Sequence, residues 1–178
     1  MGMPFTTRGF KNACHERATG VAIITSGHPV HATVVTEHAA AFPPNDDDEC
    51  YVSVIVGTNG STHRAVVASQ YFALSYLSCA QVDIVDAIYN MRIKQMSKIR
   101  WSERHNVPYV SGSNAAVLCS LKQQVTVGPN TILVGHVLDV VLADRADKPL
   151  VNYRRTFRSV DDNAIPVRHP RHGRNPRL

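Results

Sequence analysis

The chain has 178 residues, of which 44% are hydrophobic and 19% charged, values typical of one soluble globular domain rather than a disordered segment. No apolar run reaches the length of a membrane-spanning helix, and the first residues lack the apolar core of a secretory signal, so we expect a cytoplasmic protein without a membrane partner. The formal charge is +5, but residues 165–178 contain four arginines and no acidic residue. The rest of the chain is almost neutral, which argues against a nucleic-acid partner and predicts a basic, solvated tail over 165–178.

The cysteines and acidic residues carry no metal-binding pattern. Cys14, Cys50, Cys79 and Cys119 are widely spaced without a Cys-x-x-Cys pair, so we expect reduced, small packing residues. The acidic run at 46–48 lacks the alternating ligands, glycine and glutamate of a calcium loop. We predict no metal site.

The first quarter of the chain predicts one helix and two strands. Residues 6–17 have helical spacing, with Thr7 as a possible cap, and 21–25 form a short strand ended by the turn at 26–29. Residues 30–41 are predicted as one long strand, which prolines 43 and 44 end.

The central stretch, 52–77, predicts a strand (52–56), a polar break, a short helix (63–69) and a second strand (72–77). Ser61 stands where a helix N-cap is expected. The unpaired amides at a helix start favour an anion such as phosphate, although an ordinary strand–turn–helix with a capping serine has the same pattern.

The remainder predicts a long helix over 80–100, a loop over 107–112, and strands over 115–127 and 131–141 joined across 128–130. A last segment follows over 149–160. Short strands joined mostly by tight turns predict a mainly β, single-domain, antiparallel split barrel of Greek-key type with a few flanking helices, covering residues 1–164.

Six segments of the chain, in this order, match a known family pattern. They are 18–25 (ATGVAIIT), 33–44 (TVVTEHAAAFPP), 59–63 (NGSTH), 70–78 (QYFALSYLS), 128–137 (GPNTILVGHV) and 149–155 (PLVNYRR). On these segments the chain resembles, from Phe10 to Val160, the flavin reductase-like, FMN-binding split-barrel family, which includes the small reductase components of two-component monooxygenases.

This resemblance implies a homodimer that binds FMN or FAD near the subunit interface. The flavin would accept hydride from NADH or NADPH, and reduced flavin would stay bound or pass to a partner monooxygenase. Asn59, Ser61 and Thr62 would hold the phosphate. The full set of implied cofactor-binding residues is Thr33, Val35, Thr36, Asn59, Ser61, Thr62, Ser75 and Tyr153.

Two segments depart from the family pattern. Three alanines at 39–41 replace small hydrogen-bonding residues, and Glu37 is new beside an expected flavin, where its charge is unfavourable unless it is paired or protonated. Pro129 and Asn130 replace the Asp-His of the family's Gly-Asp-His, and asparagine cannot exchange a proton near neutral pH. His136 stands where the family has a glutamate.

These departures leave three hypotheses open: a flavin reductase with a variant site, a protein that keeps flavin for another redox reaction, or a flavin-free descendant. The last would bind a bulky apolar metabolite in its cavity and catalyse a non-redox reaction such as a cyclisation, with no cofactor. The candidate catalytic residues are Glu37, His38, Asn130 and His136.

Overall fold

Antiparallel strands make up most of the computed structural model, which describes residues 6–43, 49–91 and 93–160. The helices are α1 (Thr7–His15), α2 (Ser61–Ser69), the 3₁₀ turn η1 (Cys79–Gln81), α3 (Val82–Tyr89) and α4 (Ile93–Met96). The strands are β1 (Thr19–Gly20), β2 (Ala22–Ser26), β3 (His31–Val35), β4 (His38–Ala41), β5 (Tyr51–Gly57), β6 (Tyr71–Tyr76), β7 (Trp101–Arg104), β8 (Val107–Val110), β9 (Ala115–Val127), β10 (Asn130–Leu142), β11 (Leu150–Tyr153) and β12 (Thr156–Ser159).

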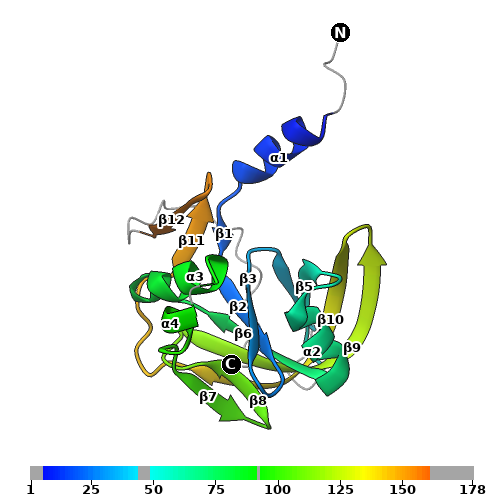
Figure 1. Cartoon of the computed structure of the whole chain (residues 1–178), viewed down its shortest axis with the longest axis vertical. Helices are drawn as coiled ribbons and strands as arrows, with labels where there is room; N and C mark the ends of the chain where they lie inside the picture. Colours follow the sequence, from blue (N-terminus) through cyan, green and yellow to red (C-terminus); the bar gives the residue numbers. More distant parts are fainter. Residues whose placement is uncertain (1–5, 44–48, 92, 161–178) are drawn as a thin grey trace, which may run out of the picture.

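One curled sheet of seven strands forms the barrel, in the order β3-β2-β6-β9-β10-β5-β4 (Figure 1). Its two edge strands, β3 and β4, follow each other in the chain and are separated only by Thr36 and Glu37. The Ile55 amide of β5 donates a hydrogen bond to the Glu37 carbonyl at 3.1 Å. The two edges therefore meet at this link, as the expected split barrel requires.

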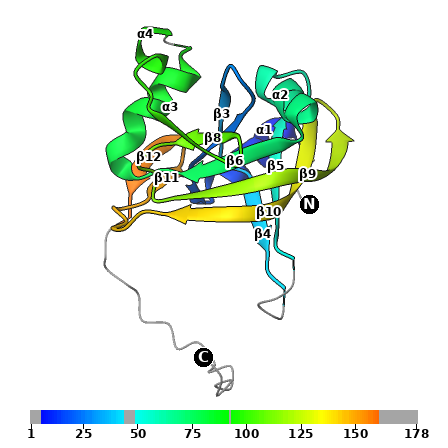
Figure 2. The same ribbon diagram turned by 90° about the horizontal axis from the view of Figure 1, so that it is seen from below.

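Smaller elements surround the barrel. Strands β1, β11 and β12 form a three-stranded sheet, and β7 pairs with β8. Helices α3 and α4 lie at one end of the barrel and α2 at the other (Figures 1 and 2).

Two main apolar clusters stabilise this arrangement. The barrel interior packs around fully buried side chains such as Val54, Phe72 and Leu133. A second cluster, which includes Ile23, Leu77 and Val85, joins the barrel wall to α3. Burial of such side chains contributes about 1.5–3 kcal/mol each to folding, which makes these clusters the main source of stability.

Three predicted elements were wrong in extent or type. The expected long strand over 30–41 is two strands on opposite sheet edges. The expected helix over 80–100 is broken after Asn90, where Met91 takes a φ of +45°, a left-handed conformation that a helix cannot continue through. The expected loop over 107–112 contains β8. This strand includes Pro108, which is tolerated because β8 is one strand of a two-stranded sheet.

Other predictions hold with small shifts. Strand β9 has its predicted bounds, and β10 begins at Asn130 rather than at Thr131. The N-cap of α1 is Thr6, not Thr7, because the Thr6 Oγ1 accepts a hydrogen bond from the Gly9 amide at 3.0 Å. The acidic residues 46–48 and the tail at 165–178 lie outside the described residues.

Helix α1 makes little contact with the barrel. None of its residues is buried, and it projects from the body of the protein (Figure 1). A polar connection from Arg154 to the end of α1, described below, holds it in place. Across the described part of the chain, helices that are both long and apolar enough for a membrane span are absent.

Gly135 provides a test of the barrel packing. A Cβ atom at this position would lie 2.4 Å from Phe72 Cζ and 2.8 Å from Cys119 Cβ, so we expect Gly135→Ala to destabilise the protein by about 1–3 kcal/mol. Gly57→Ala is the matched control, because no atom lies within 4 Å of a Cβ there. Chemical denaturation of both variants measures the difference, and equal midpoints would contradict the packing described here.

Candidate functional site

The start of α2 is formed as an anion-binding site would require. Gly60 is the N-cap with extended backbone angles, and no side chain caps the first amides. Ser61 is therefore the first helical residue and not the cap that the sequence predicted. The first turn has no acidic residue, so the positive end of the helix dipole is not neutralised within α2.

A threonine pair anchors this helix start to the barrel wall. The Thr62 side chain is 2% exposed, and its Oγ1 lies 2.9 Å from Thr33 Oγ1 on β3. Two residues predicted to contact a cofactor thus hydrogen-bond to each other. Ser61 is exposed, and its hydroxyl makes no hydrogen bond to any other described residue.

The polar turn before α2 also contacts the β9–β10 connection. The Thr58 amide donates to the Pro129 carbonyl at 3.0 Å, and Thr58 Oγ1 lies 3.0 Å from Thr131 Oγ1. Asn59 and Asn130, far apart in sequence, are consequently on adjacent segments. Both side chains are exposed.

His38 lies at the barrel edge where β4 begins. Its ring packs against the Tyr76 ring, with centroids 5.2 Å apart, and its Nε2 is buried without a hydrogen-bond partner among the described residues. Burial lowers the pKa of His38, while the Gly20 backbone and the Glu37 charge act in the opposite direction. The imidazole is therefore neutral near neutral pH, with an unsatisfied nitrogen.

Glu37 is paired, which meets the condition that the sequence analysis set for a carboxylate at this position. It forms an ion pair with Arg17, the residue that links α1 to β1. The pairing raises the pKa of Arg17 through the hydrogen bond and the charge of Glu37. Both groups are exposed, so the pair contributes little to stability.

The four candidate catalytic residues do not converge. His136 faces the outside of the barrel, where its ring lies 5.5 Å from that of Tyr51 and its Nε2 3.9 Å from Glu49 Oε1. Asn130 is six residues away on the same strand, or about 20 Å at strand spacing. Only Glu37 and His38 are close together, as neighbours in sequence.

Three predicted cofactor contacts lie apart from the start of α2. The Val35 side chain is buried in the barrel core. Ser75 is fully buried, and its Oγ accepts a hydrogen bond from the Val110 amide at 3.0 Å. Tyr153 lies under the guanidinium of Arg154, 5.3 Å from the ring centroid.

A pocket of about 420 Å³ opens beside the β3–β4 link. It contains Thr36 and Glu37 but is otherwise lined by residues that the sequence analysis did not select. These are Cys14, His15, Arg17, Thr19, Tyr89, Asn152, Arg154, Arg155 and Phe157. The Arg-Arg pair in the 149–155 segment was the available signal, but its placement beside β3 depends on the β1–β11 pairing.

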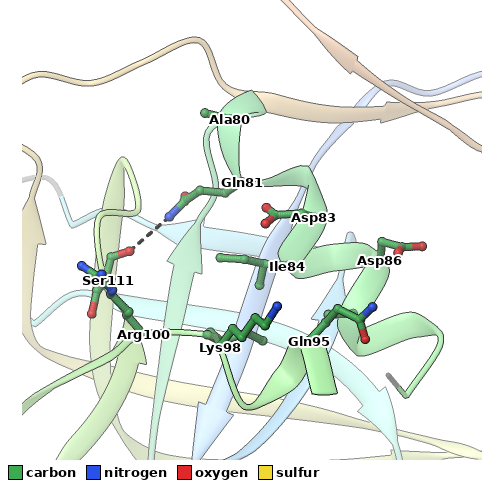
Figure 3. A pocket seen from close by; sticks show the side chains of 11 residues that line it. Ala80, Gln81, Asp83, Ile84, Asp86, Gln95, Lys98, Arg100 and Ser111 are labelled. Atoms are coloured by element: carbon green, nitrogen blue, oxygen red, sulfur yellow. Dashed lines mark hydrogen bonds between the residues drawn. The ribbon is translucent and has the colours of Figure 1, made fainter. Parts of the chain in front are cut away.

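A second hollow, of about 480 Å³, lies between α3, α4 and the end of β8 (Figure 3). Gln81 spans it and donates to the Ser111 carbonyl at 3.1 Å. None of the residues predicted as catalytic or cofactor-binding lines this hollow. Among the described residues, no group of three or more histidine, cysteine or acidic side chains is arranged to hold a metal.

Solved structures share this fold. The nitrilotriacetate monooxygenase component B homologue from Mycobacterium thermoresistibile superposes with a TM-score of 0.81 at 21% identity, over 93% of each chain. The NADH:FAD oxidoreductase SgcE6 of Streptomyces globisporus, solved with NAD and FAD fragments, gives 0.78 at 19% identity over 93% of this chain and 99% of that one. The styrene monooxygenase flavin reductase from Pseudomonas putida S12 gives 0.75 at 19%, over 89% and 99%.

Among curated protein sequences, none matches this chain significantly. The family model described as "Flavin reductase like domain" matches residues 15–161, which contain the barrel, α2 and the β11–β12 hairpin. On this match the chain belongs to the flavin reductase-like family.

Proposed function

We propose that this protein is an NAD(P)H-dependent flavin reductase that binds FMN or FAD and supplies reduced flavin to a partner monooxygenase. The observation that supports this function best is that the start of α2, strand β3 and His38 follow one another along the protein, as one continuous path. The start of α2 contacts Thr33, and the chain then runs about 10 Å along β3 to Thr36, beside His38.

The residues along this path fit a phosphorylated flavin. The amides of Ser61, Thr62 and His63, with the Ser61 hydroxyl, would hold the phosphate where no acidic side chain of α2 opposes it. Thr33 fixes that helix start, and Thr36 lies nearer the ring position. Bound flavin would supply the redox chemistry by accepting a hydride from the reduced nicotinamide.

His38 and Glu37 would act at the ring end of the path. The neutral His38 has an unsatisfied nitrogen that can form a hydrogen bond with the polar edge of a planar ligand. Because Arg17 compensates the charge of Glu37, the Glu37 carboxylate repels an electron-rich ring less. Asn130, beside the phosphate turn, would donate or accept a hydrogen bond but not transfer a proton.

The subunit arrangement is also a proposal. Ile55, Ile132 and Val125 are direct neighbours across β5, β10 and β9 on the outer face of the barrel. Ile55 is 40% and Val125 42% exposed, and this apolar row borders Asn130. We assign it to a homodimer interface, and the four free thiols are consistent with action in the cytoplasm.

Flavin binding is the first test of the proposed function. The purified protein should quench FMN fluorescence and oxidise NADH or NADPH in the presence of flavin. Ser61→Asp should weaken FMN binding at least about tenfold, because it places a negative charge against the phosphate, whereas an acid in the first turn is favourable for the helix itself.

Riboflavin, which has no phosphate, is the matched ligand control, and its affinity should not change in Ser61→Asp. Equal losses for riboflavin and FMN would place the phosphate elsewhere. A protein that neither binds flavin nor consumes NAD(P)H would overturn the function and favour the flavin-free hypothesis, in which the cavity binds an apolar metabolite.

The proposed interface has its own test. Ile55→Lys should convert a dimer to a monomer in analytical ultracentrifugation, because a buried, unpaired lysine disrupts an apolar interface. Leu142→Lys changes another exposed residue, 71% accessible, at the far end of β10 and should leave the dimer intact. A dimer that survives Ile55→Lys does not use this face.

His38 predicts a pH dependence of stability. Its pKa is lowered in the folded protein from 6.5, so the unfolded chain binds more protons and stability falls as the pH drops below 6.5. His38→Phe keeps the ring against Tyr76 and removes this titration, so its unfolding free energy should fall less steeply on acidification. Denaturant titrations at a series of pH values measure the slopes, and parallel curves for the two proteins would exclude this role of His38.

A further inference from the structure

The pocket beside Glu37 is one lobe of a larger basin. Another hollow, of about 720 Å³, adjoins this pocket, and His15, Arg154 and Arg155 line both. The shared residues lie where the end of α1 meets the turn between β11 and β12, since the Arg154 amide donates a hydrogen bond to the His15 carbonyl at 3.2 Å. We call the two hollows together the α1–hairpin basin.

Positive charge dominates this basin. Its cationic side chains are Arg8, Lys11, Arg17, Arg154 and Arg155, and its carboxylates are Glu16 and Glu37. The net charge is therefore +3 without counting His15. A hollow lined by charges of one sign raises the local concentration of counter-ions, so this basin attracts anions.

The two carboxylates are already engaged. Glu16 Oε2 accepts hydrogen bonds from Arg154 Nε at 3.0 Å and Nη2 at 2.6 Å, and Glu37 is paired with Arg17. The Arg155 side chain contacts an imidazole rather than a carboxylate: its Nε donates a hydrogen bond to His15 Nε2 at 3.3 Å. Within the described residues no carboxylate compensates Arg155, so its guanidinium is available to an anion.

The lobe of the basin beside Glu37 also has an aromatic wall. The rings of Tyr89 and Phe157 lie 6.2 Å apart at an interplanar angle of 37°, and both line the lobe that contains Glu37. Tyr89 is 55% exposed. A planar heterocycle could stack on this wall while its phosphates reach the arginines.

The backbone of the arginine turn is unfavourable for its residues. Arg154 and Arg155 have φ values of +50° and +61°, and a two-residue hairpin turn of this kind strongly prefers Asn-Gly. Neither arginine is placed there by backbone preference. Strained, non-glycine residues of this kind are concentrated at ligand-binding sites.

We propose that the α1–hairpin basin binds the adenosine phosphate part of NAD(P)H. The assignment rests on the proposed flavin reductase function for the reacting ring but extends it to the other half of the ligand. Thr36 and Glu37 link the two regions, because they line the basin and immediately precede His38. NAD(P)H with its nicotinamide at the ring end of the path would extend its phosphates past Glu37 toward Arg155, away from the flavin phosphate at the start of α2.

The test uses the full chain and ADP, followed by calorimetry. Arg155→Gly should weaken ADP binding about tenfold or more, as expected for the loss of a charge-assisted hydrogen bond. Its melting temperature should be equal or higher, because glycine is favoured at positive φ, so a loss of affinity cannot be attributed to unfolding. Tyr89→Ala should also weaken ADP binding, through the loss of stacking.

Arg158→Ala is the matched control. Arg158 is on the same hairpin and carries the same charge, but it lies next to Phe157 and so faces the opposite side of β12. ADP affinity should be unchanged in this variant. The proposal is overturned if Arg158→Ala and Arg155→Gly lose affinity equally, if neither loses any, or if inorganic phosphate binds as tightly as ADP.

Two further measurements identify the source of the adenosine and separate this proposal from the function. With FMN as acceptor, a raised KM for NADH or NADPH in Arg155→Gly assigns the basin to the nicotinamide dinucleotide. A weakened affinity for FAD with an unchanged KM for NADH and NADPH would overturn the assignment to the nicotinamide dinucleotide. Arg155-dependent ADP binding in a protein without flavin reductase activity would support the basin and reject the function, and the reverse result would do the opposite.

Discussion

The position of every candidate residue depends on how the barrel closes. The chain leaves β3 on one edge of the sheet and enters β4 on the other after only Thr36 and Glu37. The hydrogen bond from the Ile55 amide to the Glu37 carbonyl attaches this link to β5. A two-residue connection cannot span separated edges, so the sheet must curl until they meet.

This closure brings three other regions of the sequence into contact with the β3–β4 segment. Thr33 on β3 is hydrogen-bonded to the start of α2, and Glu37 forms an ion pair with Arg17 of the α1–β1 connection. His38 packs on Tyr76 of β6. The β1–β11 pairing adds the arginine turn. None of these contacts joins residues that are close in sequence, apart from the link itself, so the site is a product of the topology.

The sequence was informative where local rules apply. Alternation and the turn at 128–130 predicted β9 and β10 closely, and glycines and a polar break located α2 to within two residues. It was misleading where tertiary pairing overrides local preference. The segment 107–112 was expected to be a loop, but valines 107 and 110 are buried against the barrel wall as part of β8. Helical periodicity over 80–100 gave no sign of the break at Met91. The candidate catalytic residues, chosen where the chain departs from the family pattern, do not converge, since strand alternation places His136 outside and His38 at the edge of the barrel.

Because α1 is weakly attached, its position depends on the ionic strength of the solution. With no buried residue, the helix is held largely by polar contacts at its end, among them the Arg154–Glu16 pair and the hydrogen bond from the Arg154 amide to the His15 carbonyl. Ion pairs between exposed groups weaken as dissolved electrolyte screens them. A rise in ionic strength therefore lowers the attraction of the arginines for an anionic ligand. It also loosens the helix that forms one wall of their basin. The affinity for such a ligand would thus fall more with added electrolyte than charge screening alone predicts.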